Sequence, residues 1–280
     1  MSIKGELREI ALGENMDYFG VAPVARLDNL PEGHRPKDLL PSAKSVISIG
    51  LKIPKAALAA HEQAFKDGMR HAIYSYTVHG YNKINDKLDL AAFKIIKYLE
   101  KKYNKTAYPI PSGVPRDEEL LMSALSNRYA AVCAGHGEFG WSGFVLTPKH
   151  GAKVRWVTVI SEQELEPDEM YNGKKLCLGE KCRLCVKICP TKALSAEDLV
   201  AVEITGVKSN YAKRDKPMCR LATAGLIKGT PGKMQADIPE HLEDMNQWRD
   251  FSKKDSPWQR MEFSHANYCQ RCMVSCPVGE

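Results

Sequence analysis

The 280-residue sequence lacks any apolar run approaching the roughly 18 residues that a membrane-spanning helix needs. Residues 1–9 hold neither the apolar core of a signal peptide nor a twin arginine. Charge of one sign is not in large excess either, because the net charge is +6 and the lysine pairs along the chain are typical of solvated faces. These absences predict a cytoplasmic protein without a membrane anchor, and they give little support to a nucleic-acid footprint.

Cysteine, in contrast, is abundant, with nine residues. In a chain without an export signal, this number predicts metal ligation in a reducing compartment instead of disulfides. One of the nine, Cys133, lies in the apolar stretch 129–134 and is expected to be a small buried side chain. The other eight are therefore the candidate ligands.

Two runs with the spacing C-x2-C-x3-C-P hold six of these cysteines, over residues 182–190 and 269–277. The bacterial ferredoxin run is C-x2-C-x2-C-x3-C-P, and its last cysteine ligates the other of two clusters. Here the leading cysteine of the first run stands further out, at Cys177, and Cys219 is the upstream cysteine left for the second run. The proline after the last cysteine of each run fixes φ and turns the chain away from the ligand site.

This spacing predicts two [4Fe–4S] clusters with four thiolate ligands each. The first predicted set is Cys177, Cys182, Cys185 and Cys276, and the second is Cys189, Cys219, Cys269 and Cys272. Structural zinc is the alternative, because two C-x2-C pairs also form a four-thiolate zinc site. The duplicated x3-C-P endings and the even count of eight ligands favour the clusters.

Apolar residues at helical spacing predict helices, and β-branched runs between proline and glycine predict buried strands. Helices are expected over 3–16, 55–67, 82–103 and from 116 through 132, and strands over 17–23, 45–51, 144–146 and 154–160. The acidic and polar stretch 161–175 predicts a boundary before the cysteine-rich part. The stretch 220–268 is much longer than a compact ferredoxin needs, and we expect it to be either a structural cover or a lid.

A glycine loop follows the fourth expected helix, with Gly135, Gly137 and Gly140 in the pattern G-x-G-x-x-G. The dinucleotide fingerprint requires this pattern between a strand and a helix, whereas here it leaves a helix and enters a strand. A Rossmann site is therefore not predicted. Four glycines over residues 135–143 indicate either a tight turn between elements or backbone packed on a flat cofactor.

Three stretches, taken with the cysteine pattern, resemble the epoxyqueuosine reductase and reductive dehalogenase superfamily. They are residues 35–49, 74–85 and 129–155, and the third is similar to that superfamily's AGLGxxGxxGLLITPxYG segment. Together with the cysteines, the resemblance covers nearly the whole chain.

The resemblance implies an α+β fold with two domains. Residues 1–165 would form a nitroreductase-like α/β cobalamin-binding domain, and residues 166–280 a ferredoxin-like domain with two [4Fe–4S] clusters and the long insertion 220–268. Such proteins pass single electrons through the clusters to a base-off corrinoid, and a nearby side chain supplies a proton. By the same resemblance, the residues near the corrin would be Gly135, His136, Gly137, Glu138, Phe139, Gly140, Trp141, Ser142 and Gly143.

The sequence also departs from the superfamily pattern at the proton donor. Epoxyqueuosine reductases carry an acid in an RDYHK stretch, and matching residues 81–83 to its last three letters puts Gly80 where the aspartate would be. Dehalogenases use a tyrosine instead, so the candidate donors are Tyr81, His79 and Tyr76. Epoxyqueuosine reductases hold tRNA with a helical-repeat extension, which is missing after Cys276, so tRNA is only a weakly supported partner.

Three functions remain open from the sequence. The first is a corrinoid-dependent reductase that removes oxygen or halogen from a small organic substrate, with reduced ferredoxin or flavodoxin as the electron donor. The second is a ferredoxin-like electron-transfer protein that reactivates or handles the corrinoid of a partner. The third keeps the enzyme but replaces the corrinoid with flavin mononucleotide, which nitroreductase-like folds bind. The missing acid favours the second function, and the glycine loop favours the first.

Overall fold

The computed structural model describes residues 2–113, 122–225 and 269–279 of the chain. At its centre is an antiparallel four-stranded sheet with the order β1-β2-β6-β3. The strands are β1 (Tyr18–Pro23), β2 (Ser45–Lys52), β3 (Ala107–Ile110) and β6 (Val154–Ser161). The central strands β2 and β6 are buried over most of their length, which explains why both read as continuous apolar, β-branched runs.

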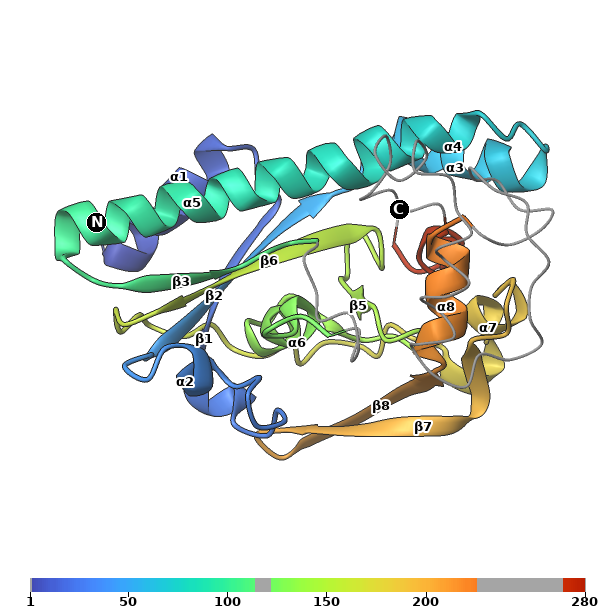
Figure 1. Ribbon diagram of the computed structural model, residues 1–280. Coiled ribbons are helices and arrows are strands. Elements are labelled where there is room, and N and C mark those ends of the chain that lie inside the picture. Colours follow the sequence, from blue (N-terminus) through green and yellow to red (C-terminus); the bar gives the residue numbers. More distant parts are fainter. Residues whose placement is uncertain (1, 114–121, 226–268, 280) are drawn as a thin grey trace.

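Helices cover both faces of this sheet (Figure 1). The covering helices are α1 (Ile3–Gly13), α5 (Lys83–Tyr103) and α6 (Asn127–Cys133). Because side chains alternate along a strand, Ile47 and Ile49 pack with α1 and α5, whereas Val46 packs with α6. The fold is therefore a mixed α/β arrangement with the sheet between two helical layers.

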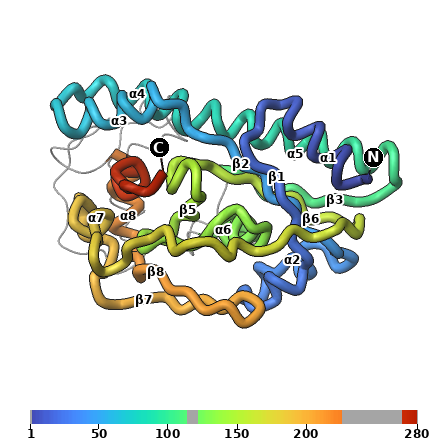
Figure 2. The backbone as a smooth tube through the Cα atoms, turned by 180° about the vertical axis from the view of Figure 1, so that it is seen from behind, coloured from blue at the N-terminus to red at the C-terminus, as the bar shows by residue number. Residues whose placement is uncertain are grey.

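The cysteine-rich part lies at the end of the sheet furthest from the N-terminus, as Figures 1 and 2 show from opposite sides. Its elements are η3 (Gly179–Lys181), α7 (Leu184–Lys187), β7 (Leu194–Ile204), β8 (Val207–Arg214), α8 (Lys216–Thr223) and α11 (Arg271–Val274). The hairpin of β7 and β8 turns at Thr205 and Gly206, both with positive φ, as a tight two-residue hairpin turn requires.

Short elements connect these parts. They are η1 (Val24–Leu27), α2 (Pro36–Leu39), α3 (Lys55–Lys66), α4 (Ala72–Ser75), the π-helix η2 (Tyr76–Asn82), β4 (Glu138–Phe139) and β5 (Val145–Leu146). Within the described ranges, no helix combines the length and the apolar character needed to cross a membrane.

Most of the expected elements are present, but the predicted start of one helix is wrong. The helix expected from 116 through 132 begins only at Asn127, because Ser126 caps it by accepting the Tyr129 N–H at 3.4 Å. Residues 122–126 are not helical, and 114–121 lie outside the described ranges. The β7–β8 hairpin was not predicted, although its Thr-Gly turn between strand-like residues is a signal for it.

Close packing between β2 and β6 gives a first testable prediction. A Cβ atom at Gly50 would overlap the ring of Trp156, the residue paired with it on the neighbouring strand. We expect Gly50→Ala to lower the free energy of unfolding by about 1–3 kcal/mol, since a buried indole cannot move away without disturbing the core. Urea denaturation followed by circular dichroism measures this change.

Gly13→Ala is the matched control, because no atom lies within 4 Å of a Cβ built there. Alanine is favoured over glycine in a helix, so this variant should be as stable as the wild type or more stable, by up to about 1 kcal/mol. Equal stabilities of the two variants would contradict the packing of Gly50 against Trp156.

Candidate functional site

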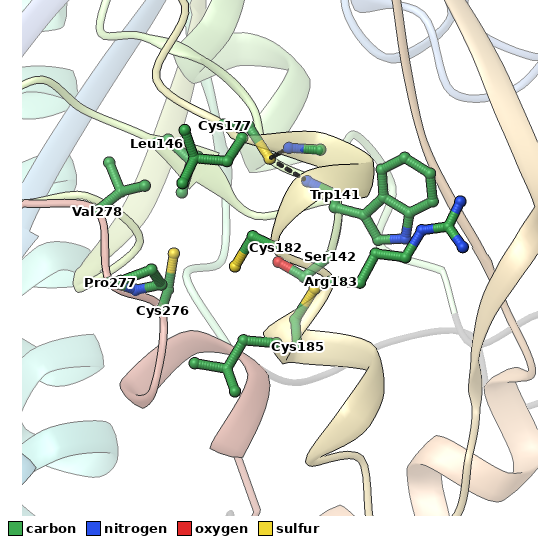
Figure 3. A pocket seen from close by; sticks show the side chains of 14 residues that line it. Trp141, Ser142, Leu146, Cys177, Cys182, Arg183, Cys185, Cys276, Pro277 and Val278 are labelled. Atoms are coloured by element: carbon green, nitrogen blue, oxygen red, sulfur yellow. Dashed lines mark hydrogen bonds between the residues drawn. The ribbon is translucent and has the colours of Figure 1, made fainter.

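Four cysteines from separate segments line one pocket of about 400 Å³, part of it open to solvent. They are Cys177 and Cys182, on either side of η3, Cys185 in α7, and Cys276 after α11. Figure 3 shows their four sulfur atoms facing the same space. This is the first predicted ligand set, and it includes a cysteine from the second run.

The glycine loop holds Cys177 in place from the side of the sheet. The carboxylate Oε1 of Glu138 accepts the backbone N–H groups of Leu176 and Cys177, both at 2.9 Å. The N–H of Trp141 and the N–H of Gly179 donate to Cys177 Sγ at 3.2 and 3.4 Å. Such N–H···S contacts stabilise a metal-bound thiolate and tune its properties.

The second predicted set is gathered nearby in the more apolar end of the cysteine-rich part. Cys269 packs with Cys189 and Cys219 in a cluster that contains residues of α8. The N–H of Ala193 donates to Cys189 Sγ at 3.3 Å, as at the first site. In Figure 2 the segments that carry these cysteines, α7, α8 and the C-terminal helix, lie side by side.

Electrostatic contacts follow the predicted division of the eight thiols with one exception, since Cys272 of the second set is influenced by Cys219 and Cys189 and also by Cys185 of the first set. Cys185 is influenced by Cys177, Cys182 and Cys276, which are the other members of its predicted set. The corresponding neighbours of Cys269 are the other members of the second set, namely Cys189, Cys219 and Cys272. The structure thus brings together the two predicted groups of four, while ligation itself stays a prediction.

Burial makes these thiols poor thiolates on their own. Burial raises the pKa of Cys185 to about 11 and that of Cys272 to about 12, and the neighbouring sulfurs add to both shifts. A coordinating metal removes the proton of a thiol outright, so ligand binding would supply the missing stabilisation. Within the described ranges, no three His, Cys, Asp or Glu side chains are arranged to hold one metal ion. Thiols on the wall of a pocket fit a multi-atom cluster.

The glycines of the loop approach this chain's own atoms. A Cβ at Gly135 would overlap the carbonyl of Glu169, and one at Gly137 would overlap the carbonyl of Leu146. Gly143 is close to Tyr211, and Gly140 faces the Leu146 side chain. This packing favours the tight turn over backbone laid on a flat cofactor.

The loop residues also contact other parts of the protein. His136 is buried and stacks on Trp156 with ring centroids 4.8 Å apart, and burial lowers its pKa to about 4, so it is neutral. Phe139 is in the core beside Tyr129, and the Ser142 carbonyl accepts Arg214 Nη2 at 2.6 Å. The residues predicted to contact a corrin therefore serve the core and the first thiol set.

The three candidate proton donors lie on η2, and π-helical turns are frequent at functional sites. Tyr76 and Tyr81 are both buried, and Tyr81 acts electrostatically on Tyr76, whereas His79 is exposed. Gly80 has no room for the missing acid, since a Cβ there would lie 2.7 Å from the Tyr76 ring. The role of His79 stays a prediction.

Tyr81 has a charged partner that sequence reasoning missed. The Arg155 guanidinium lies 4.1 Å from the centre of the Tyr81 ring, and Arg155 Nε donates to Asn85 Oδ1 at 2.7 Å. Arg155 is the one charged residue of strand β6, and this was the available signal.

Tyr76 is fully buried, and its hydroxyl has no hydrogen-bond partner among the described residues. Its ring meets that of His61 edge-on, with centroids 4.7 Å apart, and burial lowers the pKa of His61 to about 3. The charges of Cys269 and Cys272 act on Tyr76. Thus η2 lies beside the second thiol set, whereas the first set lies at the pocket open to solvent.

No family model matches the chain. A tetrachloroethene reductive dehalogenase of Desulfitobacterium hafniense is 41% identical over 70 residues, which are 24% of this chain and 12% of that protein. An epoxyqueuosine reductase of Staphylococcus aureus is 30% identical over 164 residues, which are 57% of this chain and 38% of that protein.

A solved structure of a catabolic reductive dehalogenase shares the fold, with a TM-score of 0.56 and 14% identity over 96% of this chain and 37% of that chain. The predicted resemblance is confirmed: the chain is a relative of proteins named epoxyqueuosine reductase and reductive dehalogenase. Both groups are named reductases, in agreement with the predicted oxidoreductase. The chain spans well under half the length of these relatives.

The Glu138 contacts give a second prediction. Replacing Glu138 with Ala removes the acceptor of two backbone N–H groups, each hydrogen bond to a charged group contributing about 1.5–3 kcal/mol. We expect the reconstituted Glu138→Ala protein to lose iron from the first site faster than the wild type during anaerobic chelation. Iron and sulfide assays over time measure the loss.

Glu100→Ala is the control, because Glu100 forms an exposed pair with Lys97 that contributes at most about 1 kcal/mol. Equal rates of iron loss in the Glu138 and Glu100 variants would show that the carboxylate does not support the Cys177 segment.

Proposed function

We propose that this chain is a reductase in which eight cysteines hold two [4Fe–4S] clusters that pass electrons to a base-off corrinoid. When bound, the corrinoid would supply the chemistry for reductive deoxygenation or dehalogenation of an organic substrate. The observation that carries the proposal is the gathering of the cysteines into two groups of four, with Cys276 and Cys189 exchanged between the two runs. The kinship with both groups of reductases supports the type of reaction.

In this proposal, residues 1–165 form the nitroreductase-like domain, and residues 166–280 the ferredoxin-like domain. The thiols of the first set would hold the cluster nearer to solvent, and those of the second set the cluster nearer to η2. Arg214 lies by the second set, where the charges of Cys189, Cys219 and Cys272 act on it. A cation at this place partly neutralises the thiolates of a loaded site.

Tyr81 is the proposed proton donor. The Tyr81 hydroxyl lies near Gly113. The Arg155 guanidinium above the Tyr81 ring stabilises the negative charge that develops when the phenol gives up its proton. The hydrogen bond from Arg155 to Asn85 fixes the guanidinium in this position. Tyr76 is a second candidate phenol, although its burial raises its pKa strongly and so disfavours proton release.

The cysteine partition is tested by single substitutions. Cys185→Ala should remove the first cluster and Cys189→Ala the second, so each reconstituted variant should retain about four irons per chain instead of about eight. Electron paramagnetic resonance of the reduced proteins should show two different remaining signals.

Cys133→Ala is the matched control, because Cys133 is a buried residue at the end of α6 and its thiol donates to the Arg26 carbonyl at 3.4 Å. It should keep both clusters. The proposed partition is wrong if Cys182→Ala and Cys189→Ala leave the same signal.

A second function is supported by the closed space at Gly80 and by the packed glycine loop. A chain without an acid at this position and without an open corrin surface on the loop fits an electron-transfer protein that serves or handles the corrinoid of a partner. A reductase with flavin mononucleotide in place of the corrinoid is the third candidate function. Reduced ferredoxin or flavodoxin as donor and tRNA as a partner stay predictions in each case.

Anaerobic purification with added hydroxocobalamin separates these functions. The proposed reductase should retain a corrinoid with a base-off absorption spectrum, an electron-transfer protein should show clusters alone, and a flavoprotein should be yellow after the clusters are removed. Tyr81→Phe should retain the corrinoid as the wild type does and slow turnover of a halogenated or epoxide substrate by about 100-fold or more, the usual contribution of a general acid.

Tyr108→Phe is the control, since Tyr108 is exposed on the edge strand β3. Unchanged turnover in Tyr81→Phe would move the proton donor to another residue, and His79→Ala would then be measured in the same way.

A further inference from the structure

The pocket at the first thiol set opens onto a surface of unusual charge. Between residues 171 and 193 the chain carries six basic residues and a single acidic one, Glu180. The basic residues are Lys174, Lys175, Lys181, Arg183, Lys187 and Lys192, and all five lysines are exposed. The next acids along the chain are Glu197 and Asp198, on β7.

Four of these cations lie within two residues of a candidate ligand along the chain. Lys181 precedes Cys182, and Lys187 ends α7, the helix that carries Cys185. Arg183 lies on the pocket wall, with its guanidinium 5.0 Å from the centre of the Trp141 ring. It pairs with Glu180 at 3.4 Å, which neutralises the one acid of the segment.

An apolar residue lies among these charges. Leu178 is 61% exposed although it directly follows Cys177, and it is part of the pocket wall. The wall continues with Leu184 and with Pro277 and Val278 beside Cys276 (Figure 3). A polar rim around an apolar centre is usual for a protein interface, and a basic rim complements an acidic partner.

We infer that this surface, named the Leu178 face and defined by Leu178, Lys181, Arg183 and Lys187, docks a small acidic one-electron carrier protein. The inference rests on the proposed function and adds to it the point of electron entry. The first thiol set lies beneath this face, so a carrier seated there would be near the cluster that the set would hold. Weak redox encounters bury small areas and depend on complementary charge for their rate.

A nucleic acid would also be attracted by the lysines. It would, however, have no use for an exposed leucine at a pocket that leads to four thiols. The observations therefore favour a protein carrier, and binding of RNA becomes an outcome of the test.

The experiment uses the reconstituted full-length protein with its iron content measured first. Photoreduced acidic flavodoxin is mixed with it in an anaerobic stopped-flow instrument, and cluster bleaching gives the second-order rate constant. We expect the double variant Lys181→Glu/Lys187→Glu to lower this constant about tenfold or more at low ionic strength, and the difference should shrink as salt is added. Leu178→Ser should lower it at every salt concentration.

Two controls separate docking from damage to the clusters. Lys101→Glu changes an exposed lysine of α5 at the other end of the molecule and should leave the rate constant within about twofold of the wild type. Reduced methyl viologen, a small cation, should reduce the clusters of the double variant at least as fast as those of the wild type.

The inference is overturned if the double variant and Lys101→Glu react with flavodoxin equally fast. It is also overturned if methyl viologen reduces the wild-type clusters and flavodoxin does not, or if the lysine substitutions weaken binding of a tRNA stem loop while flavodoxin reduction is unchanged. Absence of iron after reconstitution would instead refute the proposed function, so the two failures are distinguishable.

Discussion

The backbone of the C-terminal segment lies directly against the turn at Gly151, and the place of Cys276 depends on this contact. A Cβ atom at Gly151 would overlap the carbonyl of Val278, and one at Gly279 would overlap the backbone of Gly151. Both glycines have positive φ, which an L side chain rarely adopts. The turn itself is closed by two backbone hydrogen bonds between Thr147 and Gly151, at 2.9 and 3.1 Å. The turn before β6 thus holds the segment of Cys276, which is about 100 residues away from its predicted partners along the chain.

The glycine loop holds Cys177 in place on the other side of the first thiol set. Its Glu138 binds the chain just before and at Cys177, and its Trp141 donates to the sulfur. The carbonyl of Ser142 in the same loop accepts Arg214, which lies beside the second thiol set. One loop of the α/β part therefore contacts both groups of cysteines. In a chain where burial disfavours the charged form of the thiols, these donors and this cation favour the loaded, thiolate form.

How far the sequence predicts this arrangement differs between its parts. The predicted grouping of the cysteines follows from their ferredoxin-like spacing, in which the last cysteine of each run is expected to ligate the other cluster. The strands β2 and β6 follow from their β-branched runs. The role of the glycine loop could not be predicted, because a missing side chain does not reveal what fills its space, and here carbonyls of Glu169 and Leu146 do. The contact between Tyr81 and Arg155 joins residues of η2 and β6, and no local pattern encodes it.

The packing at Gly80 also limits which acid can act on η2. The position is buried, and the ring of Tyr76 lies where a side chain at 80 would begin. A carboxylate there would need a large displacement of the ring. It would also bear the cost of burying a charge without a partner, which is on the order of several kcal/mol. A phenol is neutral before it gives up its proton, so it can occupy a buried place at much lower cost. The contact of Arg155 with the ring of Tyr81 and the closed space at Gly80 therefore agree with the proposed tyrosine donor, and they leave no room for an aspartate at position 80.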